Sequence, residues 1–274
     1  MTRSRLFLYG VGFTIASLAA FFILAGLGWP GEIHFCVADN HCYCEIIQWS
    51  AIARQPVNTW SNLGCVVVGL VVLWRVDKAP VSDSIIKATS NPLREKSAES
   101  ALYGFLVIFI GIGSIFFHGG MTNYGGLLDN VAMNAYITFL VLYNFERLGV
   151  FSRRNCIILL IPVNIVLGWL SILPHLGRDM FAWVVAVEVV FELVILVAGK
   201  FNYTRLRRSW KLFVASLATF GVAMLAWNLS KTGALLCFPD SVWQGHAGWH
   251  LIVALSTWFI FKYVQSEFKV ETAS

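Results

Sequence analysis

Long hydrophobic runs dominate the chain, and few charged residues interrupt them. Each run has about 18 residues or more, which as a helix is enough to cross the hydrocarbon core of a bilayer. Backbone amides in lipid need partners within the protein, so such runs are helical. The alternation typical of a membrane β-strand is missing. The pattern predicts an all-α membrane protein with spans near residues 6–29, 57–77, 100–118, 125–145, 155–174, 180–199, 210–231 and 244–264.

The first run differs from the other seven. It follows Arg3 and Arg5, as the apolar part of a secretory signal peptide does. It is long for that role, and no convincing small-x-small cleavage site precedes Trp29, so we expect a retained anchor. The predicted architecture is a seven-helix transmembrane bundle with one extra N-terminal transmembrane helix. Its parts are an anchor (1–30), an outer-side segment (31–56), the bundle (57–265) and a cytoplasmic tail (266–274).

Composition and charge support a membrane location. Of 274 residues, 58% are hydrophobic and 13% are charged, which excludes an ordinary soluble domain. The net charge of +5 is concentrated in alternate loops, such as 75–96 and 200–211. The intervening loops carry few basic residues, with Arg54, Arg178 and Lys231 as exceptions. Under the positive-inside rule both termini lie in the cytoplasm, and the basic residues are topology signals, so no nucleic-acid partner is expected.

Four of the six cysteines fall in outward-facing segments, where oxidation is possible: Cys36, Cys42, Cys44 and Cys237. A bridge from the 36–44 cluster to Cys237 would tie the outer-side segment to the loop before the last span. An alternative is a small metal site that includes His41, but its ligand spacing is not one that zinc uses.

Three histidines are predicted to share one membrane depth. His118 ends the third span, and His246 and His250 begin the last, so all three lie on the periplasmic, luminal or extracellular side. Residues four apart share one face of a helix. Two imidazoles from one helix and one from another make a three-histidine zinc site with an open position for water.

Two further polar residues are predicted at the same depth. Ser114 lies one turn before His118, and Asp129 opens the next span. Zinc lowers the pKa of bound water from about 15.7 to about 7. A carboxylate beside that water can accept its proton and return it to a leaving amine. Ser114 could orient a ligand imidazole or polarise a substrate carbonyl.

Other polar residues have ordinary interpretations. A lone membrane histidine usually forms a helix–helix hydrogen bond, and we assign His34, His41 and His175 to that class or to loops. Glu188 and Glu192 share a face of the sixth span, and we expect them protonated and bonded to Asn164 or Asn228, or forming a proton route. Trp243 and Trp249 are interpreted as interfacial belt residues.

The combined motifs resemble the alkaline ceramidases, part of a superfamily of seven-helix membrane zinc hydrolases that includes adiponectin-receptor-like proteins. The resemblance covers roughly residues 40–265 and depends on three motifs: Asn58-Thr59-x-Ser61-Asn62, Ser114-x-x-x-His118 with Asp129, and His246-x-x-x-His250.

The resemblance implies zinc held by His118, His246 and His250, with Ser114 and Asp129 assisting hydrolysis of a ceramide amide. It also implies a disulfide between Cys44 and Cys237.

Animal members of the family bind Ca²⁺ through acidic residues near the N-terminal segment. The candidate ligands here are Asp39 and Glu45, and Gln55 stands where a further acid is expected. Because a hard cation takes six or more oxygen ligands, the resemblance supports a zinc site more strongly than a calcium site.

We therefore predict an integral-membrane, zinc-dependent amide hydrolase that cleaves ceramide or a related N-acyl lipid into a fatty acid and an amine. Its partners are the lipid bilayer and the lipid substrate, with no obligate protein partner. One alternative is a receptor-like or scaffold protein with a closed, structural zinc site. Another is a transporter that uses Glu188 and Glu192, which would require helices broken at mid-membrane.

Overall fold

The computed structural model describes residues 5–38, 43–80, 91–172 and 177–270. Its helices are α1 (Leu6–Gly26), α2 (Phe35–Ala38), α3 (Pro56–Ser61), α4 (Leu63–Lys78), η1 (Pro92–Arg94), α5 (Ala98–Gly120), α6 (Asn123–Leu148), α7 (Arg153–Ser171), α8 (Gly177–Lys200), α9 (Trp210–Leu229) and α10 (Gly245–Gln265). Two short strands, β1 (Leu206–Arg207) and β2 (Phe268–Lys269), pair antiparallel.

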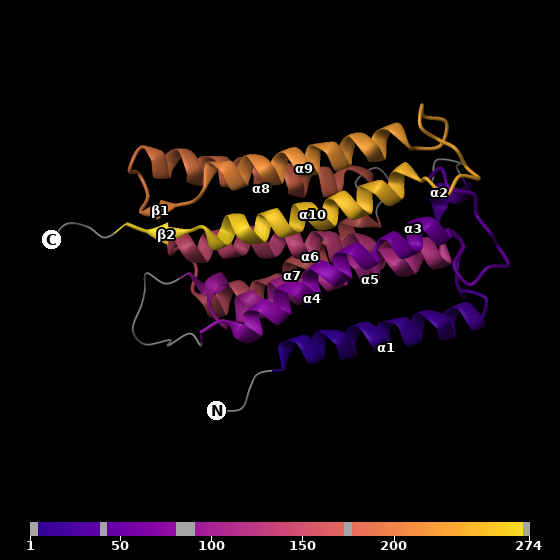
Figure 1. Ribbon diagram of the computed structural model, residues 1–274, viewed down its shortest axis with the longest axis horizontal. Coiled ribbons are helices and arrows are strands. Elements are labelled where there is room, and N and C mark those ends of the chain that lie inside the picture. The colour runs from indigo at the N-terminus through magenta and orange to yellow at the C-terminus, as the bar shows by residue number, and fades with distance from the viewer. Residues whose placement is uncertain (1–4, 39–42, 81–90, 173–176, 271–274) are drawn as a thin grey trace.

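The predicted all-α membrane bundle is confirmed. Within the described ranges, 8 helices are long and apolar enough to cross a membrane, with α3 and α4 forming one span from Pro56 to Lys78. Each predicted span overlaps one of these helices. The helices lie roughly side by side along the long axis of the molecule (Figure 1). Two features were not predicted: the break between α3 and α4, and the β1–β2 pair.

Local sequence sets several helix boundaries. The Ser97 side chain accepts the Ser100 amide at the start of α5, while Ser100 reaches back to the Ser97 amide, forming a capping box. Thr122 caps α6 in a similar way. Helix α5 ends where Met121 adopts a left-handed conformation with φ 47°. The turn at Thr122 then starts α6 directly, so the ends of two long helices lie together.

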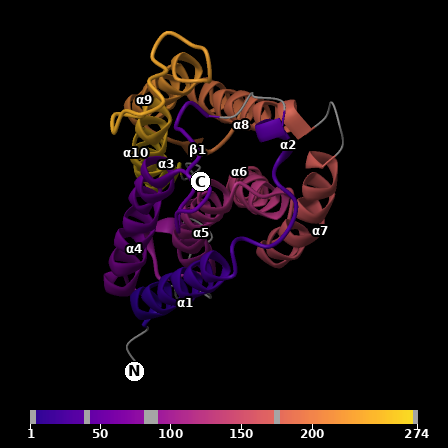
Figure 2. The same ribbon diagram turned by 90° about the vertical axis from the view of Figure 1, so that its right-hand side faces the viewer.

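Helix α5 is the central element. In its most apolar 18-residue window 78% of the residues are buried, against 17% for α1. It packs against α4 and α6, whereas α1 covers α4 and α5 from outside (Figure 2). The α4–α5 contact needs small residues, because a Cβ at Gly69 would lie 2.6 Å from Gly104 O, and one at Gly111 would lie 2.7 Å from Asn62 O.

The two ends of the bundle differ in charge. The C-terminal ends of α4, α6 and α8 and both described ends of the chain lie at one end, together with β1 and β2 (Figure 1). This is the end that carries the basic loops. The segments that lead into α3, α6 and α10 lie at the other end. The three histidines belong to that second end, so they are separated from the basic loops by the length of the helices.

Candidate metal centre and substrate cavity

Three buried imidazoles meet at the second end of the bundle. His118 comes from the last turn of α5, and His246 and His250 come from the first turns of α10. Each is at most 4% exposed. One nitrogen of each ring lies within 4.8 Å of the others. The Nε2 atoms of His118 and His246 are 3.2 Å apart. The structure therefore brings together the three histidines that were predicted as one group.

The end of α5 is held by the chain segment before α3. The last carbonyls of a helix have no partner within the helix. Here the amides of Gln55 and Arg54 donate to His118 O at 3.1 Å and Gly119 O at 2.9 Å, and the Arg54 guanidinium donates to Gly120 O at 2.5 Å. This pairing fixes the turn that carries His118.

Hydrogen bonds at Nδ1 orient two of the rings. His118 Nδ1 donates to Gln55 Oε1 at 2.8 Å, because the other end of that amide donates to Glu45 O. His250 Nδ1 lies 2.8 Å from Ser61 Oγ and 3.1 Å from the amide nitrogen of Asn62. At His118 the bond to Gln55 leaves Nε2 with a lone pair, as a metal ligand requires.

The donor set fits a zinc ion. His246 Nε2 lies 3.2 Å from His118 Nε2, a separation that suits two nitrogens sharing either a proton or a cation. Ligand nitrogens about 2.0–2.1 Å from tetrahedral zinc are roughly 3.3 Å apart, close to the observed separation. Asp129 does not belong to the group of clustered donor atoms. Among the described residues, the three histidines are therefore the candidate metal ligands.

Ser114 and Asp129 form a hydrogen-bonded pair beside the histidines. The Ser114 hydroxyl bonds to the Asp129 carboxylate, and both residues line the same cavity as His246 and His250. They are 4% and 8% exposed. A Cβ at Gly113 would lie 2.9 Å from Leu128 O, so glycine lets α5 and α6 approach closely enough for this pair to form.

A disulfide joins the outer-side segment to the loop before α10. Cys44 and Cys237, the pair implied by the family resemblance, are bonded with an S–S distance of 2.12 Å. The neighbouring Tyr43 ring lies 3.8 Å from the His246 ring, centroid to centroid. Burial raises the pKa of the Tyr43 phenol above its usual range, and the nearby Asp129 raises it further. Tyr43 therefore stays protonated beside the histidines.

Glu45 is used as a helix cap. Its two carboxylate oxygens accept the amides of Val57 and Asn58, both at 2.7 Å. Burial raises the pKa of Glu45, and these two amides oppose that shift. Asp39, the other candidate Ca²⁺ ligand, lies outside the described residues, as do His41, Cys42 and His175. The calcium site stays a prediction.

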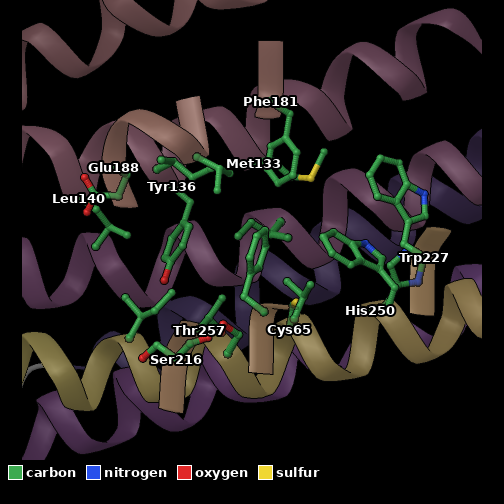
Figure 3. Close-up of a pocket in the computed structure, with 18 of the residues that line it drawn as sticks. Cys65, Met133, Tyr136, Leu140, Phe181, Glu188, Ser216, Trp227, His250 and Thr257 are labelled. Carbon is green, nitrogen blue, oxygen red and sulfur yellow. Dashed lines mark hydrogen bonds between the residues drawn. The ribbon is translucent and has the colours of Figure 1, made fainter. Parts of the chain in front are cut away.

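An apolar cavity extends from the histidines into the bundle (Figure 3). His250 lies near one end and Glu188 near the other, with Tyr136 and Met133 between them. The belt interpretation of Trp249 was wrong, because this side chain is 7% exposed, packs on Trp227 and lines the cavity. Its contact with Trp227 of α9 places it between α9 and α10.

The expected partners of Glu188 and Glu192 were also wrong. The amides of Asn164 and Asn228 donate to carbonyls of their own helices. The carboxylates are instead bonded by Asn144 of α6, a helix that packs on α8. The packing of α6 on α8 determines which asparagine bonds the two carboxylates. Residue spacing along the sequence does not reveal that packing.

Two of the presumed topology residues are buried. The Arg208 and Arg147 side chains are 0% and 7% exposed and form ion pairs with Glu192 and Glu267. These carboxylates raise the pKa of Arg208, against the effect of burial. Arg208 therefore serves as an internal charge and not only as a loop cation.

The role of Gln55 was not predicted. It was noticed only as a residue where an acid was expected, although it holds His118 in the structure. The available signal was its place in a run of polar residues that opens the first core span, from Arg54 to Asn62. In the structure, Ser61 and Gln55 of this run contribute to the histidine site itself.

The fold and the site define a polytopic membrane protein with a buried three-histidine group that could bind a metal ion. A family model described as Ceramidase matches residues 40–272. The chain belongs to the ceramidase family, which comprises ceramide-hydrolysing membrane enzymes, so it is a hydrolase acting on amide bonds with a lipid substrate. A search of the curated proteins finds no match.

Proposed function

We propose that this protein is a zinc-dependent amidase that hydrolyses ceramide or a related N-acyl lipid to a free fatty acid and an amine. The observation that carries the proposal is the convergence of three buried imidazoles at one end of an apolar cavity. His118, His246 and His250 would hold the metal. The chemistry supplied by bound zinc is acidification of a water molecule and polarisation of the substrate carbonyl.

Asp129 is proposed as the proton carrier. In hydrolysis the water oxygen bonds to the carbonyl carbon, the C–N bond breaks, and one proton moves from the water to the leaving nitrogen. A carboxylate that lines the cavity beside the histidines can accept that proton and deliver it. Ser114 bonds to Asp129 and not to an imidazole, so its proposed role is to hold the carboxylate in place.

Lipid access is proposed from the side of the bundle. Phe181 and Val185 of α8 and Leu217 and Phe220 of α9 line the cavity. Leu217 is 43% exposed, so the cavity wall at α9 reaches the outer surface of the bundle. An amphiphile dissolved in the bilayer can then place its chain in the cavity and its amide at the histidines without crossing water.

The proposed orientation places the histidine end away from the cytoplasm. Basic loops and both described chain ends lie at the opposite end of the bundle (Figure 1). Lysine and arginine concentrate in cytoplasmic loops of membrane proteins. The site would then face the periplasm, an organelle lumen or the exterior, where the Cys44–Cys237 disulfide can persist.

Hydrolysis of palmitoyl ceramide by the purified protein tests this proposal, with products followed by lipid mass spectrometry. We expect fatty acid and amine in equal amounts, loss of turnover with a chelator and recovery with zinc. Asp129→Asn should lower kcat by roughly 10²–10⁴-fold while keeping the metal, because proton transfer is lost. His246→Ala should lose both metal and turnover.

His34→Gln is the matched control, because His34 lies outside the clustered donor group. It should keep wild-type metal content. Hydrolysis at the wild-type rate by a metal-free His118/His246/His250 triple variant would contradict the proposed mechanism, and a wild-type rate for Asp129→Asn would remove Asp129 from it.

A further inference from the structure

The inner end of the substrate cavity is polar. Its wall is formed by apolar side chains such as Ile137, Leu140 and Val189, but the last lining residues include Glu188, Glu192 and Tyr263. Figure 3 shows Glu188 at the opposite end of the cavity from His250. Thirteen residues separate His250 from Tyr263 on α10, which corresponds to about 20 Å of helix. That length is comparable with an extended long-chain acyl group.

Most of the polar groups at this end already satisfy one another. Arg208 contacts Glu192 at 2.7 Å and Glu267 at 2.5 Å, and Arg147 contacts Glu267 at 2.5 Å. The Tyr263 hydroxyl donates to Glu192 at 2.7 Å. Two guanidinium groups therefore balance two carboxylates, with their hydrogen bonds made.

Glu188 is the additional acid. It lies one turn before Glu192 on α8 and is 7% exposed. The Glu188 carboxyl hydrogen-bonds to Glu192, its Oε1 also accepts a long hydrogen bond of 3.4 Å from Asn144, and its Oε2 receives no bond from an amide, hydroxyl or guanidinium. Apart from the Glu188–Glu192 contact, His246 Nδ1 and Glu188 Oε2 are the only fully buried side-chain atoms without a partner among the described residues that line the cavity. One atom is at each end of the cavity.

A carboxyl oxygen that receives no donor at the end of an apolar cavity selects the group that reaches it. A buried polar atom without a hydrogen bond is destabilising, and a chain ending in a methyl group leaves that atom unpaired. A hydroxyl can both donate and accept, so it pairs with Glu188 in either protonation state. Arg208 acts on Glu188 electrostatically but gives its hydrogen bonds to Asn144, Glu192 and Glu267.

We propose that Glu188 binds a hydroxyl group near the far end of the substrate's acyl chain, so that the preferred substrates are N-acyl lipids with a terminally hydroxylated chain. This inference rests on the proposed function for the position of the amide at the histidines. The acyl chain begins at the carbonyl carbon itself, so it is the chain that enters the cavity nearest to His250. Its distal hydroxyl would displace any water at Glu188.

The test compares palmitoyl and omega-hydroxypalmitoyl chains in two measurements on the full-length protein. The first is the dissociation constant of each free acid, followed by fluorescence of Trp227 and Trp249, which line the cavity. The second is the hydrolysis rate of the two N-acyl sphingosines. Wild-type protein should bind the hydroxylated acid roughly tenfold tighter, as expected for one additional buried hydrogen bond.

Variants at Glu188 assign that preference to one side chain. Glu188→Leu should bind both acids equally or favour the methyl-terminated one. Glu188→Gln keeps a hydrogen-bonding group and should retain the preference, which guards against misfolding of the leucine variant. Ser216→Ala is the control: this hydroxyl lines the cavity but already donates to Leu212 O, so its removal should leave the ratio unchanged.

The outcomes separate this inference from the proposed function. Equal affinity of the wild-type protein for the two acids, or a preference that survives in Glu188→Leu, would overturn the role of Glu188 even if both lipids are hydrolysed. A preference that depends on Glu188, in a protein that hydrolyses neither lipid, would support the binding site and contradict the amidase.

Discussion

At the scale of single residues, the site depends on the side chains that contact Nδ1 of the histidines. This is the ring nitrogen that does not face the proposed metal position. Gln55 accepts from His118 Nδ1, and Ser61 and Asn62 lie within hydrogen-bonding distance of His250 Nδ1. These contacts orient both rings, and the bond to Gln55 also fixes the tautomer of His118. Gln55 is itself held by Glu45 O, so the ring position is linked to the segment that carries the disulfide.

Replacing Gln55 with leucine should lower zinc affinity and hydrolysis roughly 10–100-fold, because loss of such a partner lets the imidazole rotate. Competition with a chelator of known affinity measures the zinc affinity of each variant. Gln48→Leu is the control, since Gln48 belongs to the same segment but is exposed. Unchanged zinc affinity in Gln55→Leu would show that the His118 ring is held by packing alone.

At the scale of elements, close helix contacts bring the polar groups together. The α3–α4 break occurs at Asn62, and Gly111 of α5 lies against the Asn62 carbonyl. Gly113 makes the same kind of contact with α6 at Leu128. Glycines of α5 thus lie against the N-terminal parts of α4 and α6. The polar residues at the start of these two helices can therefore reach the histidines.

Gly111→Ala should destabilise the protein by about 1–3 kcal/mol, because the new Cβ would lie 2.7 Å from Asn62 O and 2.8 Å from Val66 Cγ2. Gly221→Ala in α9 is the matched control, with nothing within 4 Å of its added Cβ. Thermal unfolding in detergent compares the two. Equal melting temperatures would mean that the α4–α5 contact adapts at no cost.

At the scale of the whole molecule, the length of the hydrophobic runs was enough to predict the number, type and approximate bounds of the spans, because a run of this kind within lipid must be helical. The histidine group was predictable because i, i+4 spacing and span polarity fix both face and depth. The ion pairs of Arg208 could not be predicted from the sequence, because they depend on a loop that turns toward the interior of the bundle. The role of Gln55 also needed the tertiary pairing of its segment with α5.

Two equally exposed positions at opposite ends of the bundle test the proposed orientation. Trp243 at the histidine end and Tyr203 at the basic end are each 86% exposed. In sealed vesicles of known orientation, a membrane-impermeant maleimide should label Trp243→Cys from the non-cytoplasmic side and Tyr203→Cys from the cytoplasmic side. The free cysteines of the described chain, Cys65 and Cys156, are buried and give low background. The reverse labelling pattern would invert the topology.

X-ray absorption at the zinc edge of the purified protein tests the central claim most directly, since it reports the atoms that contact the metal. We expect one zinc per chain with three imidazole nitrogens and one oxygen at about 2.0–2.1 Å, and loss of this signal in His246→Ala. A sulfur ligand, or a fourth protein ligand that closes the coordination shell, would contradict a hydrolytic site built from His118, His246 and His250.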